Sequence, residues 1–260
     1  MKSKQSNYRE RIYHHYASNI QDMPDALNEA DARRWGRAYR YYLRQWLPKK
    51  HSAKIVDLAC GSGKLLLLFR DSGYRDITGV DISPEQVILA KQVISTVEEA
   101  NILDWLESHP NEFDLITGFD IIEHLYKQEV FPFLDACHTA LKPKGRLILQ
   151  TPNADSLWGA QLRYGDFTHE VGFTPNALTR LLHIAGYQNI RSSETGPIPL
   201  RYSVRSSIRY LIWRVIRTGL KAWNLAETGH SGSGIFTRVF LITGEKVSTG
   251  GGAPTQTELS

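Results

Sequence analysis

The stretch FDIIEHL, residues 119–125, places two carboxylates and one imidazole within five positions, directly after an apolar run. If Asp120, Glu123 and His124 open a helix, their spacing of i, i+3 and i+4 places all three side chains on one face. Two carboxylates held that close repel each other unless a positive group lies between them. That group could be a metal ion, a substrate or a nearby arginine.

A further histidine could complete a metal site. His169 lies in RYGDFTHEVGFTP, an irregular connection that follows a predicted strand. Carboxylate oxygens and neutral imidazoles suit Mg²⁺, Mn²⁺ or Zn²⁺, and Asp166 or Glu170 could orient His169 from beside it. The competing interpretation is that Glu123 and His124 only cap a helix near a ligand site.

A glycine turn forms the second feature with chemical meaning. In IVDLACGSGKL, a strand ends in Gly61 and Gly63 and leads into a helix, where backbone can approach a ligand closely. Asp81 ends the next strand, about 20 residues after Gly61. An acid at this place can accept hydrogen bonds from both hydroxyls of a ribose. A dinucleotide dehydrogenase would share these features, but position 66 is Leu rather than a third glycine. Asp57 would also repel a pyrophosphate and suits a ligand ammonium.

The elements that position these residues alternate between strands and helices. Strands are predicted at KIVDLA, DITGVDI, EFDLITGF and RLILQTP, followed by two closing strands at YQNIRSSE and IFTRVFLITGE. Strands that alternate with helices indicate βαβ units on a parallel sheet. Because the carboxyl ends of such strands share one cleft, His169 is expected to face the Asp120 cluster.

The helices have recognisable starts and ends. An aromatic and basic helix is predicted from Ala32 to Leu47, and DIIEHLYKQEVFPFLDACHTAL is expected to be mostly helical. Ser83 is expected to cap a helix that begins at Pro84, and Thr174 caps another that ends at Gly186.

Composition sets the broad class. The chain has 260 residues, of which 42% are apolar and 22% charged, and a net charge of +4, too weak by itself to argue for nucleic-acid binding. Two cysteines favour neither a disulfide framework nor a cysteine zinc site. The polar first thirty residues do not read as a signal peptide, and a spanning helix is not expected. A cytoplasmic protein is predicted.

The chain divides into three parts. Residues 1–31 are expected to form a polar arm, 32–246 one domain, and 247–260 a flexible tail of linker composition. Within the domain, residues 32–50 form a helical lid and residues 199–228 an amphipathic insert. One face of that insert is apolar (Ile208, Leu211, Ile212, Val215 and Trp223) and the other cationic (Arg214, Arg217 and Lys221).

VDLACGSG, GVDIS, FDLITGFDIIEHL and LKPKGRLILQTPN occur in the order and spacing of four class I S-adenosylmethionine-dependent methyltransferase motifs, and residues 53–190 resemble that family. The resemblance implies a Rossmann-like, doubly wound α/β fold. Its sheet is mostly parallel and seven-stranded, with helices on both faces. The implied S-adenosylmethionine site consists of Asp57, Ala59, Gly61, Gly63, Asp81, Ile82, Asn101 and Phe119. Asp81 would bind the ribose and Ile82 the adenine, and Asn101 replaces an acid of many relatives.

The D-x-x-E-H pattern followed by His169 is similar to E-x-x-E-H in metal-dependent O-methyltransferases of small-RNA 3′ ends and of ubiquinone biosynthesis. That similarity implies a metal held by Asp120, Glu123, His124 and His169, although Asp120 is one methylene shorter than the usual Glu. A metal would activate an acceptor hydroxyl. Without one, His169 or His124 would serve as the catalytic base.

The acceptor is implied by resemblance alone. The segment QTPNADSLWGAQLRYGDFTHEVGFTPNALTRLLHIAGY is similar to bacterial methyltransferases of surface-polysaccharide and glycolipid biosynthesis, which implies a sugar hydroxyl. The alternatives are an RNA 2′-hydroxyl, which lacks support from any appended RNA-binding domain, and a quinone or phenol. The helix at 203–225 could rest on an anionic inner membrane face, or pack on the sheet edge or a second subunit.

Overall fold

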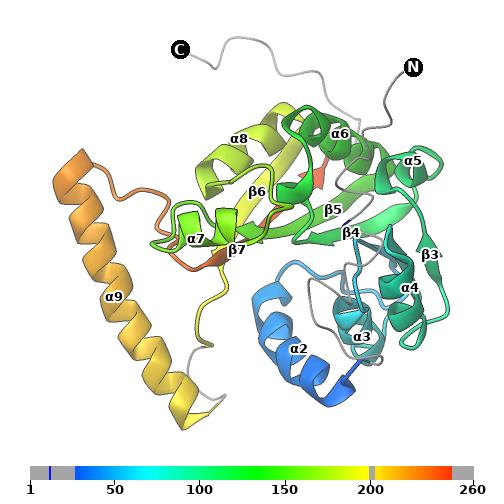
Figure 1. The fold of residues 1–260 in the computed structure, drawn as a ribbon, viewed down its shortest axis with the longest axis horizontal. Coiled ribbons are helices and arrows are strands. Elements are labelled where there is room, and N and C mark those ends of the chain that lie inside the picture. Colours follow the sequence, from blue (N-terminus) through cyan, green and yellow to red (C-terminus); the bar gives the residue numbers. More distant parts are fainter. Residues whose placement is uncertain (1–11, 13–26, 199–202, 248–260) are drawn as a thin grey trace.

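The predicted sheet is confirmed by the computed structural model, which describes residues 12, 27–198 and 203–247. Seven strands lie in the order β3-β2-β1-β4-β5-β7-β6 (Figure 1). Only β7 runs antiparallel to its two neighbours, β5 and β6, among these described strands. The doubly wound α/β architecture is therefore correct.

All the described strands except β3 lie at segments that the sequence predicts. Their bounds are β1 Lys54–Leu58, β2 Asp76–Asp81, β3 Val97–Glu99, β4 Phe113–Phe119, β5 Leu141–Pro152, β6 Tyr187–Glu194 and β7 Val239–Lys246. The central strands β1 and β4 are buried on both faces, which explains their nearly continuous apolar sequences. β3 is short and exposed at two of its three residues, so it carries no comparable signal.

Helices cover both faces of the sheet. Their bounds are α2 Glu29–Leu43, α3 Lys64–Asp71, α4 Pro84–Lys91, α5 Ile102–Glu107, α6 Val130–Ala140, α7 Gly159–Gly165, α8 Pro175–Ile184 and α9 Val204–Thr228. One hydrophobic core joins the sheet to α5, α6 and α8. A second core joins the opposite face to α2, α3 and α4. No helix among the described residues is long and apolar enough to cross a membrane.

Some helix boundaries differ from the prediction. α2 begins earlier than Ala32 because the Asn28 side chain accepts hydrogen bonds from two backbone amides at its start. Ser83 stands at the start of α4, but its hydroxyl makes no capping bond. Thr174 does cap α8, and Gly186 follows that helix with a φ of +87°.

The largest local correction concerns Asp120. It does not open a helix: its φ is +54°, and the chain then forms two 3₁₀ turns, η2 Ile122–His124 and η3 Lys127–Glu129, before α6 begins at Val130. The i, i+3, i+4 argument for a shared helical face therefore fails. Glu123 and His124 instead lie together in the short η2 turn.

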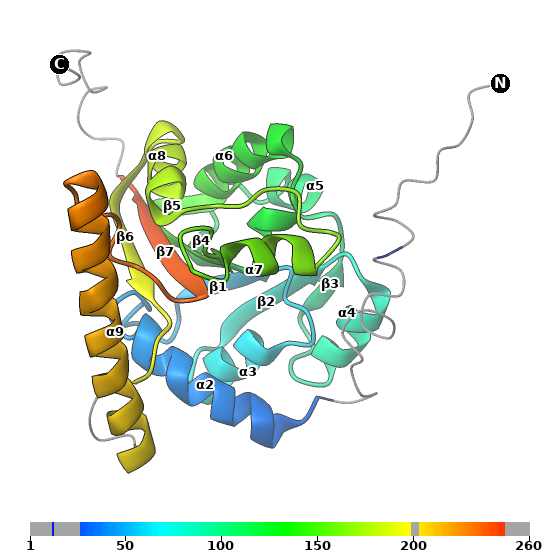
Figure 2. The same ribbon diagram turned by 60° about the vertical axis from the view of Figure 1, so that its left-hand side comes forward.

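The amphipathic insert is helical, as predicted, but its orientation is unexpected. α9 stands beside the β6 end of the sheet (Figures 1 and 2), and its described residues include no buried side chain. Its apolar face points away from the protein, so the alternative in which that stripe packs on the sheet edge is wrong, and contact with a membrane or a second subunit stays a prediction. Apart from residues 12, 27–31 and 247, the predicted arm and tail lie outside the described residues, as does the start of the insert at 199–202.

Candidate active site

A cavity lies at the carboxyl ends of the central strands. Its volume is about 690 Å³, and both of the residue groups singled out above contribute to its wall. The predicted site residues among its lining are Asp57, Ala59, Gly61, Asp81, Ile82, Asn101, Phe119, Asp120, Glu123, His124 and His169. The glycine turn and the acid–histidine cluster thus open onto one space, as the parallel-sheet argument predicts.

The glycine turn is shaped by backbone conformations that few other residues adopt. Gly61 has φ +53° and Gly63 φ +85°, both in the left-handed region. A Cβ built on Gly61 meets only Gln86 Oε1, at 3.9 Å, so this backbone faces open cavity. A Cβ on Gly63 would lie 3.2 Å from both Ala90 Cα and Val93 Cγ2. Gly63 is therefore needed for close packing on α4 rather than as part of the cavity lining.

Asp81 fixes the geometry of this turn. Its Oδ2 accepts a hydrogen bond of 2.8 Å from the Gly61 amide, and its Oδ1 accepts one of 2.9 Å from the Ser83 amide. Each carboxylate oxygen has a second lone pair, so both can still accept a bond from a ligand hydroxyl. Burial raises the pKa of Asp81 above its ordinary value.

Asp57 is buried behind the turn without a cation. Its Oδ1 accepts a 2.7 Å hydrogen bond from the Thr117 hydroxyl. Burial, and to a smaller extent the negative charge of Asp81, raise the pKa of Asp57 to about 7. A ligand ammonium placed beside it would relieve this cost, so the residue fits the amino-acid end of S-adenosylmethionine.

The remaining predicted cofactor residues differ in what they offer. Ile82 is half exposed within the lining and presents an apolar surface suited to a nucleobase. Phe119 packs against Tyr39, with ring centroids 5.6 Å apart. Asn101 Oδ1 accepts a bond from the Leu103 amide and so caps α5. Asn101 therefore both stabilises the start of α5 and lines the cavity.

Three side chains in the wall of the same cavity form a candidate metal group. One ligand atom from each of Glu123, His124 and His169 lies within 4.8 Å of the other two, and the described residues contain no other such group. The two imidazole rings lie 4.7 Å apart. The backbone also joins the two segments that carry these side chains, because the Glu123 carbonyl accepts hydrogen bonds from the amides of Glu170 and Val171.

Both histidines are oriented through Nδ1. In His169, Nδ1 lies 2.8 Å from the Leu162 carbonyl oxygen and must donate to it. In His124, Nδ1 lies 2.9 Å from Thr168 Oγ1, whose hydroxyl proton is directed to Asp166 Oδ1 at 2.6 Å. In each ring the lone pair therefore resides on Nε2. Such a hydrogen bond from the second ring nitrogen is typical of histidines that bind metals.

Glu123 provides the clearest sign of a missing positive partner. Its side chain is 2% exposed; Oε2 accepts a 3.0 Å bond from Thr151, whereas Oε1 has no hydrogen-bond partner. Burial, with the negative charge of Asp120, raises the pKa of Glu123 well above its ordinary value. A buried carboxylate oxygen without a partner is costly. A divalent cation is a group that this donor set fits.

Asp120 occupies a different setting. The structure does not bring it into the three-residue group, and both its oxygens instead accept bonds from Gln150 Nε2, at 3.1 and 2.9 Å. Gln150 Oε1 in turn accepts a 2.6 Å bond from the Tyr39 hydroxyl. Tyr39 belongs to the predicted helical lid, whereas Gln150 and Thr168 are not among the predicted site residues. A polar residue in the apolar run RLILQTP was the one available signal for Gln150.

Comparison with known families supports the fold and the cavity. The family described as "Methyltransferase domain" matches residues 13–192, more than half of the chain. The chain belongs to the class I S-adenosylmethionine-dependent methyltransferases. The cradle around Gly61 and Asp81 in this methyltransferase is thus where its methyl donor is expected.

Relatives of this methyltransferase include O-methyltransferases. A small RNA 2′-O-methyltransferase of Arabidopsis thaliana is 28% identical over 127 residues, covering 43% of this chain and 13% of the plant protein. A ubiquinone biosynthesis O-methyltransferase of Xanthomonas campestris is 30% identical over 107 residues, covering 39% of this chain and 44% of that protein. The match therefore spans less than half the length of either relative.

A solved structure agrees with the fold. The crystal structure of a SAM-dependent methyltransferase from Archaeoglobus fulgidus superposes with a TM-score of 0.61. The superposition covers 81% of this methyltransferase and 94% of the archaeal chain, at 21% identity. The shared architecture is thus the whole sheet with its helices rather than one motif.

Proposed function

We propose that this protein transfers a methyl group from S-adenosylmethionine to a sugar hydroxyl of a glycan or glycolipid precursor, with help from a divalent metal. One observation carries the proposal. Glu123, His124 and His169 form a candidate metal group in the same cavity as the donor cradle, and Glu123 Oε1 is buried there without a partner.

The chain's own residues divide the work between binding and proton transfer. Asp57 would pair with the donor ammonium, and Asp81 would accept hydrogen bonds from its ribose. Transfer forms a bond between the acceptor oxygen and the methyl carbon and breaks the carbon–sulfur bond, so that S-adenosylhomocysteine and a methyl ether result. The hydroxyl proton must also leave: with a metal bound it would pass to solvent water, and without a metal the lone pair on His169 Nε2 would accept it.

A divalent ion held by Glu123, His124 and His169 would lower the pKa of a hydroxyl bound to it. The oriented Nδ1 atoms support this use, because they place the lone pair of each ring on Nε2, the atom that would bind the ion.

The acceptor class is proposed from two considerations. The names of the relatives specify transfer to oxygen, on small RNA in one case and in ubiquinone biosynthesis in the other. A sugar acceptor would also suit a metal site, because two adjacent hydroxyls present a pair of oxygens to one cation. The sequence similarity to polysaccharide and glycolipid enzymes favours the sugar among them.

The test is a methyl-transfer assay with three acceptor classes: lipid- or nucleotide-linked sugars, small RNA and dihydroxyphenols. Chelator-treated protein is assayed with and without restored Mg²⁺, Mn²⁺ or Zn²⁺. The proposal expects transfer to the sugars that is lost on chelation and regained with one of these metals. Transfer confined to RNA or phenols overturns the acceptor class, and undiminished turnover after chelation overturns the metal.

A further inference from the structure

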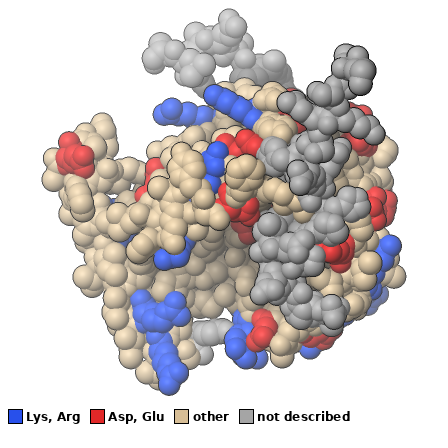
Figure 3. Space-filling view, in the orientation of Figure 1, with Lys and Arg blue, Asp and Glu red and all other residues tan. Residues whose placement is uncertain are grey.

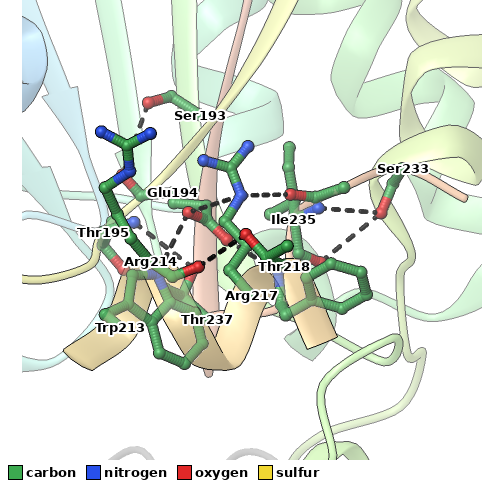
Figure 4. A network of polar contacts seen from close by, with 12 residues as sticks. Ser193, Glu194, Thr195, Trp213, Arg214, Arg217, Thr218, Ser233, Ile235 and Thr237 are labelled. Carbon is green, nitrogen blue, oxygen red and sulfur yellow. Dashed lines mark hydrogen bonds and ion pairs between the residues drawn. The ribbon is translucent and has the colours of Figure 1, made fainter. Parts of the chain in front are cut away.

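The helix α9 is attached to the body of the protein by its polar face. Glu194, at the end of β6, accepts hydrogen bonds from Trp213 Nε1 at 3.2 Å and from the Phe236 amide at 3.0 Å, and its Oε2 lies 3.5 Å from Arg217 Nε. Arg217 also donates to the Gly234 carbonyl. Figure 4 shows these side chains between the helix and the sheet. The contacts fix which side of α9 faces inward.

The opposite side of the same helix is apolar and exposed. We call it the outer stripe, and it consists of Val204, Ile208, Leu211, Ile212, Val215 and Trp223. The exposed fractions of these side chains range from 53 to 79%. Apolar faces of helices normally face the core, and a large exposed apolar surface indicates an interaction site.

Charge on α9 indicates the kind of partner. The helix carries five basic residues and one acidic residue, Glu227. Of the basic residues, Arg217 is paired with Glu194, and Arg205 and Arg209 are exposed near the start of the outer stripe. In Figure 3, Lys and Arg gather over the N-terminal half of α9, without Asp or Glu beside them. A partner surface with negative charge is therefore favoured over a neutral or basic one.

We propose that the outer stripe docks on an anionic membrane surface. A helix of 25 residues is about 37 Å long. Lying flat, it would place six apolar side chains in the lipid interface while its arginines contact acidic headgroups. A second copy of the chain is a poorer partner, because facing helices would bring two basic surfaces together.

This inference goes beyond the proposed function, and its test does not depend on methyl transfer. Binding of the full chain is measured by co-sedimentation with vesicles of phosphatidylcholine alone or mixed with phosphatidylglycerol. Wild-type protein is expected to bind the mixed vesicles, less strongly as salt is raised, and to bind phosphatidylcholine weakly.

Two variants separate the apolar and the charged contributions. Leu211→Glu with Val215→Glu is expected to weaken binding at least tenfold, since two apolar side chains that would enter the lipid interface are replaced by charges that anionic lipid repels. Arg205→Gln with Arg209→Gln should weaken it by about fivefold per arginine. The matched control is Ile184→Glu on α8, where an apolar side chain is 70% exposed outside the stripe. That variant should bind as the wild type does.

Solution size without lipid completes the test. The proposal expects the wild type and all three variants to be monomers and to have the same melting temperature. It is overturned if the mixed vesicles do not bind the wild type, if Ile184→Glu weakens binding as much as the stripe variant, or if the stripe variant converts a dimer into monomers.

Discussion

The Thr168 hydroxyl lies 2.9 Å from Nδ1 of His124 and so determines which nitrogen of that ring holds its proton. Asp166 makes this arrangement firm, because it accepts bonds from both the Thr168 amide and the Thr168 hydroxyl. Although burial acts to raise it, these bonds keep the pKa of Asp166 below its ordinary value, so the residue remains an acceptor. Thr168 is thus a positioning residue for His124.

Thr168→Val should weaken metal binding by about 10–100-fold, because His124 loses the nearer of the two Thr168 oxygens that orient its Nδ1 and keeps only the carbonyl at 3.3 Å. The measurement is metal affinity by calorimetry. Thr179→Val removes a hydroxyl that bonds only to the Pro175 carbonyl in α8, and should leave that affinity unchanged. Equal losses in both variants would contradict the positioning role.

His169→Ala should abolish methyl transfer while leaving donor affinity within a few-fold, because the ring belongs to the acid–histidine group and makes no hydrogen bond to the glycine turn. Donor affinity is measured with S-adenosylhomocysteine, and transfer with the best acceptor from the assay above. Loss of S-adenosylhomocysteine binding would show instead that His169 holds the cavity together.

Donor binding should depend on pH through Asp57. Its pKa of about 7 in the ligand-free protein means that the carboxylate is largely protonated in mildly acidic solution and cannot pair with an ammonium. S-adenosylhomocysteine affinity should therefore fall as pH drops below 7, by up to tenfold per unit. Calorimetry in buffers of different ionisation enthalpy should detect proton release on binding near pH 7. A flat profile would contradict this.

Asp57→Asn should stabilise the ligand-free protein while weakening donor binding. A carboxyl whose pKa is raised on folding binds more protons in the folded state, so stability falls as pH rises from about 4 to 7. Removing that charge should raise the free energy of unfolding at pH 8 by roughly 2–4 kcal/mol, and by less at pH 5. Denaturant titration measures both, with the exposed Asp135→Asn on α6 as a control that should show neither change.

Gly61→Ala and Gly63→Ala should differ in kind. The first costs about 1 kcal/mol of stability for its left-handed backbone, and should lower donor affinity at least tenfold because its new methyl enters the cavity. The second should cost about 2–4 kcal/mol, since its methyl also meets the backbone of α4. Denaturant titration and S-adenosylhomocysteine affinity separate the two effects, and identical behaviour of the variants would contradict the assignment.

The sequence predicts those features whose cause is local. Apolar runs mark the buried strands β1, β2 and β4, and the two glycines mark a turn that only left-handed backbone allows. The order of elements then brings Asp57, Asp81 and His169 to one edge of the sheet. Short elements such as β3 and α7 lack a periodic pattern long enough to detect.

Orientation is what the sequence does not contain. The periodicity of α9 shows that Ile208, Leu211 and Val215 share a face, but whether that face turns inward is decided by the bonds of Trp213 and Arg217 to Glu194, which is distant in sequence. Likewise, the spacing of Asp120 suggests a helix, whereas its left-handed backbone begins a turn.

The carbonyl of Glu123 bonds the two amides that follow His169, so the acid and the histidine share one backbone frame that does not involve their side chains. Substituting any of the three candidate metal ligands, Glu123, His124 or His169, would leave these backbone hydrogen bonds in place. Single replacements at these positions could therefore exchange a metal-assisted mechanism for an acid–base mechanism, or the reverse, while the shape of the cavity is preserved. A change of mechanism at this site would thus require no change in the course of the backbone.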